Sequence, residues 1–194
     1  MSTNIFMNRA IPADPLDPAF NGLLGVVLCG GESRRMGRDK GLLQTDGQPW
    51  VLRMGDKLAY HQLPVVYSIN KKQVSAYSTW LPAGRVVVDS DDGAGPLKGL
   101  LSVHYRYPGA SLLVVACDMQ DLDGSTIAQL IEVWRAGDAG NYAFEVDGFL
   151  QPFCAIYSQF SSINRFASLR ELLLGNPLHR LKGESDAFRN YNTL

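Results

Sequence analysis

The sequence has little net charge, few cysteines and no long apolar run. Its 18 Lys and Arg residues nearly balance its 19 Asp and Glu residues, and the net charge at pH 7 is −1. A chain so close to neutral has no general basic surface for nucleic acid, so any phosphate site must be local. No apolar stretch approaches the ~20 residues of a membrane-spanning helix, and the first residues lack the apolar core of a secretory signal. We therefore expect no nucleic-acid or membrane partner and a cytoplasmic location.

The three cysteines are too few and too scattered for a framework of covalent links. Cys29, Cys117 and Cys154 are far apart, and each has apolar neighbours. Neither a disulfide framework nor a zinc site fits this odd number and spacing. We expect reduced thiols in a hydrophobic core. The three histidines share no spacing with each other or with a carboxylate, so we expect no catalytic role for them.

The length of 194 residues suits a single domain with a substantial core. The first 20 residues contain Pro12, Pro15 and Pro18 among polar residues. This composition favours a flexible tail over residues 1–20, followed by one domain over residues 21–194.

Strand and helix patterns alternate through the first two thirds of the chain. Short apolar runs bounded by turn residues are typical of strands buried on both faces, and the stretches between them have helical spacing. Such alternation predicts a three-layer, Rossmann-like α/β fold with a mostly parallel central sheet. The strands are expected at Leu23–Leu28, Pro64–Ile69, Arg85–Asp89 and Ser111–Cys117, and the helices from Pro49, at Lys71–Thr79, Pro96–Tyr107 and Ser125–Ala136.

The last third of the chain has a different pattern. Asn141–Val146 and Phe149–Tyr157, joined through Asp147-Gly148, predict a hairpin. A helix over Gln159–Leu174 and a short strand over Phe188–Asn192 are expected to follow. Ligands of open α/β sheets bind beyond the carboxyl ends of the strands, so candidate residues should directly follow strands.

The first strand ends abruptly in Gly30-Gly31, and four cations follow within ten residues. Glycines at the end of a strand expose backbone N–H groups, which hold anions, and nearby cations add charge. The spacing matches neither the P-loop nor the dinucleotide fingerprint. We interpret the segment as a polyphosphate-binding loop, whose cations are Arg34, Arg35, Arg38 and Lys40.

This segment resembles the signature Leu-Ala-Gly-Gly-x-Ser-x-Arg-Met-Gly-x-Asp-Lys. The signature belongs to nucleotidyltransferases that make activated sugars, isoprenoid precursors and the molybdenum cofactor. The Gly-Gly pair and the Asp-Lys ending point to the molybdenum cofactor guanylyltransferases, and the resemblance extends over residues 22–193. It implies a nucleotidyltransferase fold, catalytic roles for Arg34 and Lys40, and nucleotide binding by Leu28, Cys29, Gly30, Gly31 and Lys40.

Asp118 directly follows the apolar strand that ends at Cys117. A carboxylate at that edge can hold Mg²⁺, which prefers oxygen ligands and bridges phosphate oxygens. A helix-capping or turn aspartate is the alternative. Cys117-Asp118 matches the family's Cys-Asp-x-Pro, which implies catalytic, nucleotide-binding and metal-binding roles for Asp118. Gln120 replaces the proline, so we expect a looser turn.

Asp89 stands at the end of a predicted strand, and Gly95-Pro96 opens a predicted helix. The segment beginning at Gly95 resembles the family's Gly-Pro-Leu-x-Gly-Leu, which implies a nucleoside pocket formed by Asp89, Gly95 and Pro96. The alternative is that the glycines simply make a turn. Asn70 follows the second strand and is a further candidate for nucleoside binding.

Two other segments resemble the family in its acceptor half. Gln151-Pro152 corresponds to a family Gln-Pro on the pterin side, and Asn190-Tyr191-Asn192-Thr193 resembles the closing motif Asn-x-Asn-Thr-Pro. The resemblance implies cofactor-substrate contacts for Gln151, Pro152 and Asn190, and a metal ligand at Asn192. The asparagines could alternatively form turns.

The implied activity is Mg²⁺-dependent transfer of GMP from GTP to the molybdopterin cofactor, with release of pyrophosphate. The implied partners are GTP, the molybdopterin cofactor, and molybdoenzymes or cofactor-insertion proteins. Three alternatives stay open, one of which is that the chain is a subunit or a fragment of a fused protein whose tail docks elsewhere. The protein could be another nucleotidyltransferase, acting with CTP on molybdopterin or with a nucleotide on a sugar phosphate. It could also be a non-catalytic protein that binds GTP or the cofactor.

Overall fold

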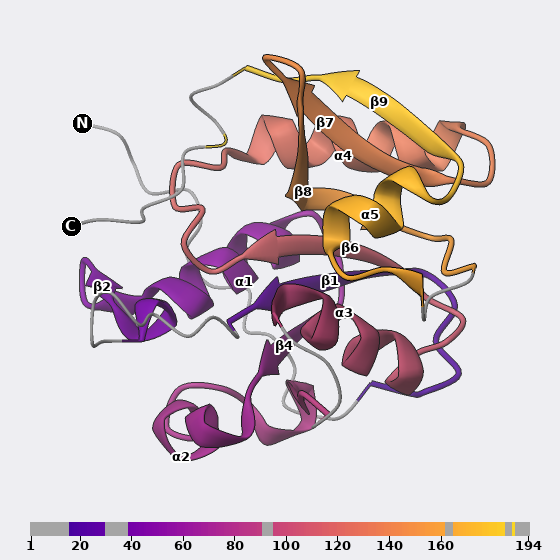
Figure 1. The fold of residues 1–194 in the computed structure, drawn as a ribbon. Helices are drawn as coiled ribbons and strands as arrows, with labels where there is room; N and C mark the ends of the chain where they lie inside the picture. The colour runs from indigo at the N-terminus through magenta and orange to yellow at the C-terminus, as the bar shows by residue number, and fades with distance from the viewer. Residues whose placement is uncertain (1–15, 30–38, 91–94, 162–164, 185–187, 189–194) are drawn as a thin grey trace.

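The computed structural model describes residues 16–29, 39–90, 95–161, 165–184 and 188 (Figure 1). Its centre is a seven-stranded sheet with strand order β5-β4-β1-β6-β8-β7-β9. Only β8 pairs antiparallel with its neighbours, so the sheet is mostly parallel as predicted. The strands are β1 (Leu23–Leu28), β4 (Val65–Ile69), β5 (Val86–Val88), β6 (Ser111–Ala116), β7 (Asn141–Val146), β8 (Phe149–Tyr157) and β9 (Leu178–Lys182).

Helices lie on both faces of this sheet, which makes the fold a three-layer α/β sandwich (Figure 1). A separate two-stranded sheet pairs β2 (Gln44–Thr45) with β3 (Gln48–Pro49) directly before the first α-helix. The α-helices are α1 (Trp50–Tyr60), α2 (Val74–Tyr77), α3 (Gly95–Arg106), α4 (Gly124–Ala136) and α5 (Leu169–Leu174), and the 3-10 helices are η1 (Lys40–Leu42), η2 (Lys71–Gln73) and η3 (Ala83–Arg85).

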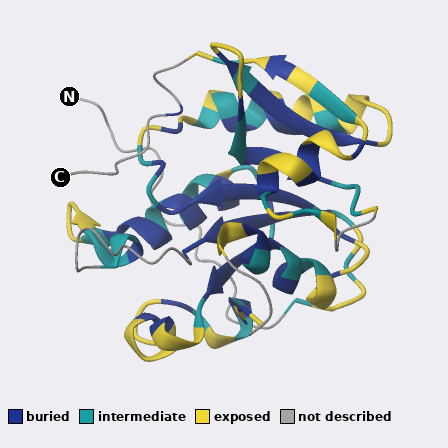
Figure 2. Cartoon of the chain, in the orientation of Figure 1, coloured by how far each residue is buried: buried dark blue, intermediate teal, exposed yellow. Residues whose placement is uncertain are grey.

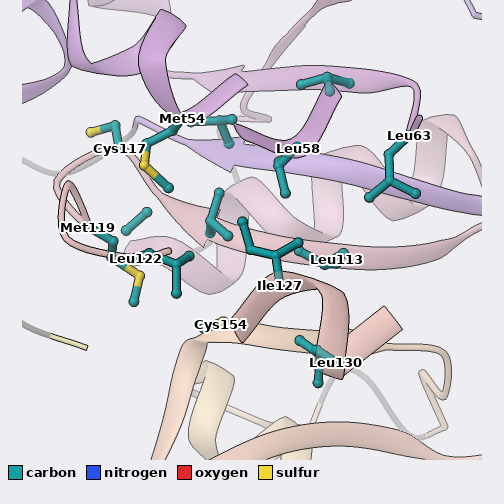
Figure 3. Close-up of a cluster of buried hydrophobic side chains, with 14 of the residues drawn as sticks. Met54, Leu58, Leu63, Leu113, Cys117, Met119, Leu122, Ile127, Leu130 and Cys154 are labelled. Carbon is teal, nitrogen blue, oxygen red and sulfur yellow. The ribbon is translucent and has the colours of Figure 1, made fainter. Parts of the chain in front are cut away.

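Two hydrophobic cores fill the space between the layers. On one face, Met54 and Leu58 of α1 and Ile127 of α4 belong to one buried cluster with Leu113 of β6 (Figure 3). The opposite face carries a second cluster, formed with side chains of α3 and α5. The strands between the two cores are almost wholly buried, whereas the outer helix surfaces are exposed (Figure 2). Burial on both faces explains why the parallel strands are continuous apolar runs.

Strand register brings the chemically important positions to one edge. Leu28, at the end of β1, lies opposite Ala116 of β6 and Ser68 of β4. The residues that follow these three strands therefore leave the sheet at the same carboxyl edge. Because β1 is central, the segments after β1, β4 and β6 are neighbours there.

Most predicted elements are confirmed with boundaries within one or two residues. The four parallel strands, the hairpin and the first four helices all lie where the sequence places them. No helix in the described residues is long and apolar enough to cross a membrane.

The predicted helix over Gln159–Leu174 is wrong at its beginning, because the helix starts only at Leu169. The backbone N–H groups of Ser158 and Gln159 donate to Asn141 Oδ1, each at 2.9 Å, which anchors the chain in a non-helical form directly after β8. Ser168 then caps α5 by accepting from the N–H of Glu171 at 3.2 Å. A buried asparagine and a capping serine thus override a broader helical pattern.

The strand β9, which pairs parallel with β7, was not predicted from the sequence. Its residues are mostly polar because β9 is an edge strand. The strand expected over Phe188–Asn192 is not present at Phe188, which lies in a 3-10 turn with its ring 5.1 Å from that of Phe144. Residues 189–192 lie outside the described part of the chain.

The expectation of a tail over residues 1–20 concerns mainly residues 1–15, which the structure does not describe. Within the described part, Leu16 and Phe20 are partly buried and pack against the second core.

Candidate active site

Lys40 and Asp118 meet at the carboxyl edge of the sheet. Lys40 Nζ donates to Asp118 Oδ2 at 2.9 Å, although the two residues are 78 positions apart in sequence. Their side chains are 17% and 15% exposed, so the pair is shielded but reachable from solvent. The structure thus brings together two of the three residues predicted to be catalytic. Arg34, the third, lies outside the described residues.

This pair can exchange partners when ligands arrive. A phosphate oxygen can replace the carboxylate as partner of the Lys40 ammonium, and a divalent cation can replace the ammonium as partner of Asp118. Partial burial strengthens each of these interactions relative to bulk water. The pair therefore keeps opposite charges side by side where a nucleotide phosphate and its cation would both be needed.

The turn that carries Asp118 is firmly anchored, contrary to the expectation of a looser turn. Gln120 Nε2 donates to the carbonyl of Cys117 at 2.7 Å, and Arg53 Nε donates to Gln120 Oε1 at 3.2 Å. Lys57 Nζ donates to the carbonyls of Gln120 at 2.6 Å and Leu122 at 2.8 Å. Burial lowers the pKa of Lys57 to about 8. Side chains from α1 thus take over the ordering that a proline ring would provide.

Asp89 lies at the end of β5, with only 6% of its surface exposed. Its Oδ1 accepts from Ser68 Oγ at 2.6 Å, and burial raises the pKa of this carboxyl group. A Cβ atom at Gly99 would come within 2.4 Å of Ser68 Oγ, so the glycine lets α3 pack directly over this pair. In the structure, Asp89 joins β4 to β5 beneath α3, and its nucleotide-binding role stays a prediction.

Gly95 and Asn70 have clear local structural roles at the same edge. Gly95 begins α3 with φ +69°, a conformation that favours glycine, and Pro96 follows it on the exposed surface. Asn70 caps η2: its side chain accepts from the N–H of Gln73, while its own N–H donates to Gln73 Oε1. Nucleoside contacts by these three residues remain predictions.

Leu28 and Cys29 lead into the predicted phosphate loop and are buried. All three cysteines are free and buried, as predicted. Burial, together with the neighbouring Cys117 side chain, raises the pKa of the Cys29 thiol well above its usual value. Cys29 Sγ is therefore protonated at neutral pH, and Cys29 can contribute its backbone rather than a reactive thiolate.

Gln151 and Pro152 lie at the same edge as Asp118. β8 runs antiparallel to β6 with Cys154 opposite Val115, so the beginning of β8 lies beside the end of β6. Gln151 Nε2 donates to the carbonyl of Phe149 at 3.2 Å, and both predicted residues are partly exposed. Besides Arg34, four predicted site residues lie outside the described residues: Gly30, Gly31, Asn190 and Asn192.

No group of three or more His, Cys, Asp or Glu residues that could hold a metal ion occurs in the described ranges. Asp118 is thus not part of a cage made by several acidic side chains from that part of the chain.

Comparison with known proteins places these features in a family. The profile of the MobA-like NTP transferase domain matches residues 25–182, which is most of the chain. The chain belongs to this family. Its nucleotidyltransferase character agrees with the loop signature and with the meeting of Lys40 and Asp118.

Individual relatives agree with this assignment. A "Molybdenum cofactor guanylyltransferase" of Shewanella frigidimarina is 30% identical over 184 residues, covering 87% of this chain and 90% of the relative. A "Molybdenum cofactor biosynthesis bifunctional protein" of Synechocystis is 34% identical over 137 residues, covering 70% of this chain but only 39% of that protein. This chain therefore spans well under half of the Synechocystis protein.

A solved structure has the same fold. Molybdopterin-guanine dinucleotide biosynthesis protein A from Archaeoglobus fulgidus superposes with a TM-score of 0.71, covering 88% of this chain and 92% of that one, at 19% identity. At this identity the likeness concerns the fold alone, and it confirms the predicted α/β nucleotidyltransferase architecture.

Proposed function

We propose that this protein transfers GMP from GTP to the terminal phosphate of the molybdopterin cofactor and releases pyrophosphate. The observation that carries the proposal is the contact between Lys40 Nζ and Asp118 Oδ2 at the carboxyl edge of the sheet. Nucleotide transfer is assisted by a positive group that stabilises charge on the triphosphate and by a carboxylate that holds the accompanying cation. The names of the guanylyltransferase relatives support guanine as the base and molybdopterin as the acceptor.

The acceptor phosphate is already anionic near neutral pH, so the reaction needs no strong general base. Its oxygen attacks the α-phosphorus of GTP in line and expels pyrophosphate. The barrier arises mainly from repulsion between two anions and from the need to align them. Lys40 would stabilise negative charge on the triphosphate and on the departing pyrophosphate. Arg34 and the N–H groups of Gly30 and Gly31 are predicted to share this role.

Mg²⁺ fits the chemistry of Asp118. Mg²⁺ commonly binds through one or two carboxylates, with water and substrate phosphates completing its shell, so it needs no cage of protein ligands. Asp118 supplies such a carboxylate at a partly exposed position, and Asn192 is the second predicted ligand. When bound, the cation would neutralise charge on the α-phosphate. Because Asp118 has a fixed position directly after β6, its carboxylate would determine where the cation binds.

The acceptor would approach from the β8 side of the site. Gln151 and Pro152 are proposed to contact it because the beginning of β8 lies beside the end of β6. Asp89, Gly95, Pro96 and Asn70 are proposed to shape the nucleoside side, towards β4 and β5. The two substrates would then meet across Asp118, with the reacting phosphates over the centre of the sheet edge.

The decisive test is incubation of the protein with Mg²⁺, molybdopterin cofactor and each of GTP, CTP, ATP and UTP, with pyrophosphate release as the measurement. Release with GTP alone supports the proposal, whereas release with CTP alone would assign the cytidylyl reaction. Binding of GTP without release would identify a non-catalytic binding protein. Replacing molybdopterin with sugar phosphates in parallel reactions tests the remaining alternative.

A further inference from the structure

Gln73 connects the two ends of the predicted phosphate loop. Its Nε2 donates to the carbonyl of Cys29 at 3.0 Å and to Asp39 Oδ2 at 2.5 Å. Cys29 directly precedes residues 30–38, and Asp39 directly follows them. Both hydrogens of one amide group are thus used to hold together two residues that are ten positions apart in sequence. Gln73 is itself buried, with 8% exposure.

Asp39 is held by further donors. Tyr77 Oη donates to Asp39 Oδ1 at 2.7 Å, and the N–H of Gly41 donates to the same oxygen at 3.1 Å. These donors occupy the carboxylate of Asp39. The side chain of the adjacent Lys40 extends to Asp118. The positive charge of Lys40 is therefore directed to the reaction site rather than to its sequence neighbour.

The packing around Tyr77 shows that this arrangement is specifically built. A Cβ atom at Gly41 would lie only 2.1 Å from Tyr77 Oη, so a larger residue at that position would exclude the tyrosine hydroxyl. Tyr77 is fully buried. The Asn70 cap of η2 fixes Gln73 from the other direction. We call Asp39, Gln73 and Tyr77 the loop clasp.

We infer that Gln73 and Tyr77 are positioning residues for nucleotide transfer, acting through Asp39 to hold the adjacent Lys40 in place beside Asp118. The inference rests on the proposed function of Lys40. When the backbone that carries a cationic side chain is already fixed, less conformational freedom is lost as that side chain binds a triphosphate, so the triphosphate binds more tightly. Neither side chain needs to contact the substrate.

The test uses Gln73→Met and Tyr77→Phe, which remove only the hydrogen-bonding groups. Matched controls are Asn176→Leu, which removes a buried amide that donates to the carbonyl of Leu172, and Tyr142→Phe, which removes a hydroxyl that donates to the carbonyl of Asp138. Asn176 and the Tyr142 contact with Asp138 lie near the amino ends of β9 and β7, away from the site. Each variant is measured for the Kd of GTP, for kcat and for both KM values.

Both clasp variants should raise the Kd and KM of GTP several-fold and lower kcat/KM by ~10-fold to 100-fold, the usual scale for groups that orient a catalytic residue. The KM of the acceptor should not change, and the controls should stay within about twofold of wild type on every constant. A partly unfolded enzyme would lose kcat at unchanged KM. An unchanged KM and Kd of GTP in both clasp variants, or equal losses in the controls, would overturn the inference.

A double-mutant cycle with Lys40→Ala provides a second, independent measurement. If the clasp acts through Lys40, Tyr77→Phe should weaken GTP binding and lower kcat/KM much less in the Lys40→Ala background than in wild type. Fully additive effects of the two substitutions would contradict the inference. The Kd measurement needs no acceptor. Wild-type protein that binds GTP but transfers nothing would refute the proposed function while leaving the clasp testable on Kd alone.

Discussion

Lys57 Nζ donates to the backbone carbonyl of Gln120 at 2.6 Å, which joins α1 to the turn that carries Asp118. The same ammonium also donates to the carbonyl of Leu122. One charged group thus orders both sides of a turn at the candidate site.

This contact predicts that the difference in the free energy of unfolding between wild type and Lys57→Met depends on pH. The pKa of Lys57 falls to about 8 from an unfolded value of 10.5, mainly because burial penalises the charge. Between these values the unfolded chain binds more protons at Lys57 than the folded chain, so this group makes the free energy of unfolding increase as pH rises. We expect the stability of wild type relative to Lys57→Met to increase from pH 8 to pH 10. Urea unfolding of both proteins at several pH values measures it.

A control for this experiment is Lys71→Met, which replaces an exposed lysine. Measuring this variant over the same pH interval separates the contribution of Lys57 from effects of pH that any lysine-to-methionine replacement would share. A difference between wild type and Lys57→Met that stays constant from pH 8 to pH 10 would contradict the assignment of a lowered pKa to Lys57.

The Lys40–Asp118 pair leads to a prediction about turnover. Lys40→Ala and Asp118→Ala should each lower kcat by about 10²–10³, the scale of one lost charge-stabilising group. A matched control is the ion pair between Arg180 of β9 and Glu145 of β7, whose nitrogen and oxygen atoms are 2.6 Å apart. Like Lys40–Asp118, it joins a basic side chain to a carboxylate. Arg180→Ala should leave kcat unchanged. Full activity in Lys40→Ala or Asp118→Ala would remove that residue from the mechanism.

The sequence was sufficient for the parts of the fold that depend on local periodicity. Buried parallel strands such as Leu23–Leu28 are continuous apolar runs, and α4 carries an apolar stripe, so both could be located without tertiary information. The late start of α5 could not, because it depends on Asn141 accepting from the backbone after β8. The edge strand β9 was not predicted because one of its sides faces solvent, which leaves its sequence mostly polar.

The arrangement of the candidate site was predictable only in part. Asp118 and Lys40 were predicted as site residues because each stands in a motif, and the structure brings their side chains together, while their roles stay predictions. Gln73 and Tyr77 were missed as site residues because they lie in a segment with only a weak helical pattern. The spacing Asn70-Lys71-Lys72-Gln73 resembles a capping box and was the one local signal available. Nothing local connects it to Asp39, since that contact spans 34 positions.

The close approach of α3 to the Ser68–Asp89 pair predicts that Gly99→Ala is destabilising. The added Cβ would lie 2.4 Å from Ser68 Oγ and 3.4 Å from Asp89 Oδ1. Overpacking of this kind costs about 1–3 kcal/mol in the free energy of unfolding. The control is Gly124→Ala at the start of α4, where the nearest atom would be 3.6 Å away. Thermal or chemical unfolding of both variants compares the two positions.

A rescue variant sharpens this prediction. In Ser68→Ala the hydroxyl that crowds position 99 is absent, so adding Gly99→Ala to it should cost less than Gly99→Ala costs in wild type. Equal costs in the two backgrounds would mean that Ser68 is not the limiting contact.

The buried thiols predict very slow modification of the native protein. Cys29, Cys117 and Cys154 are 4%, 6% and 0% exposed, and burial raises the pKa of Cys29 and Cys154. Because the thiolate is the reactive form, a disulfide reagent such as DTNB should release almost no thionitrobenzoate from native protein at pH 7.5 and three equivalents after denaturation in guanidinium. Rapid reaction of one thiol in the native protein would identify an opening of the sheet edge. Comparing Cys29→Ala with Cys154→Ala would then show whether the opening occurs beside the predicted phosphate loop or within β8. Saturating GTP should slow the reaction of the exposed thiol only if the opening lies beside the predicted phosphate loop.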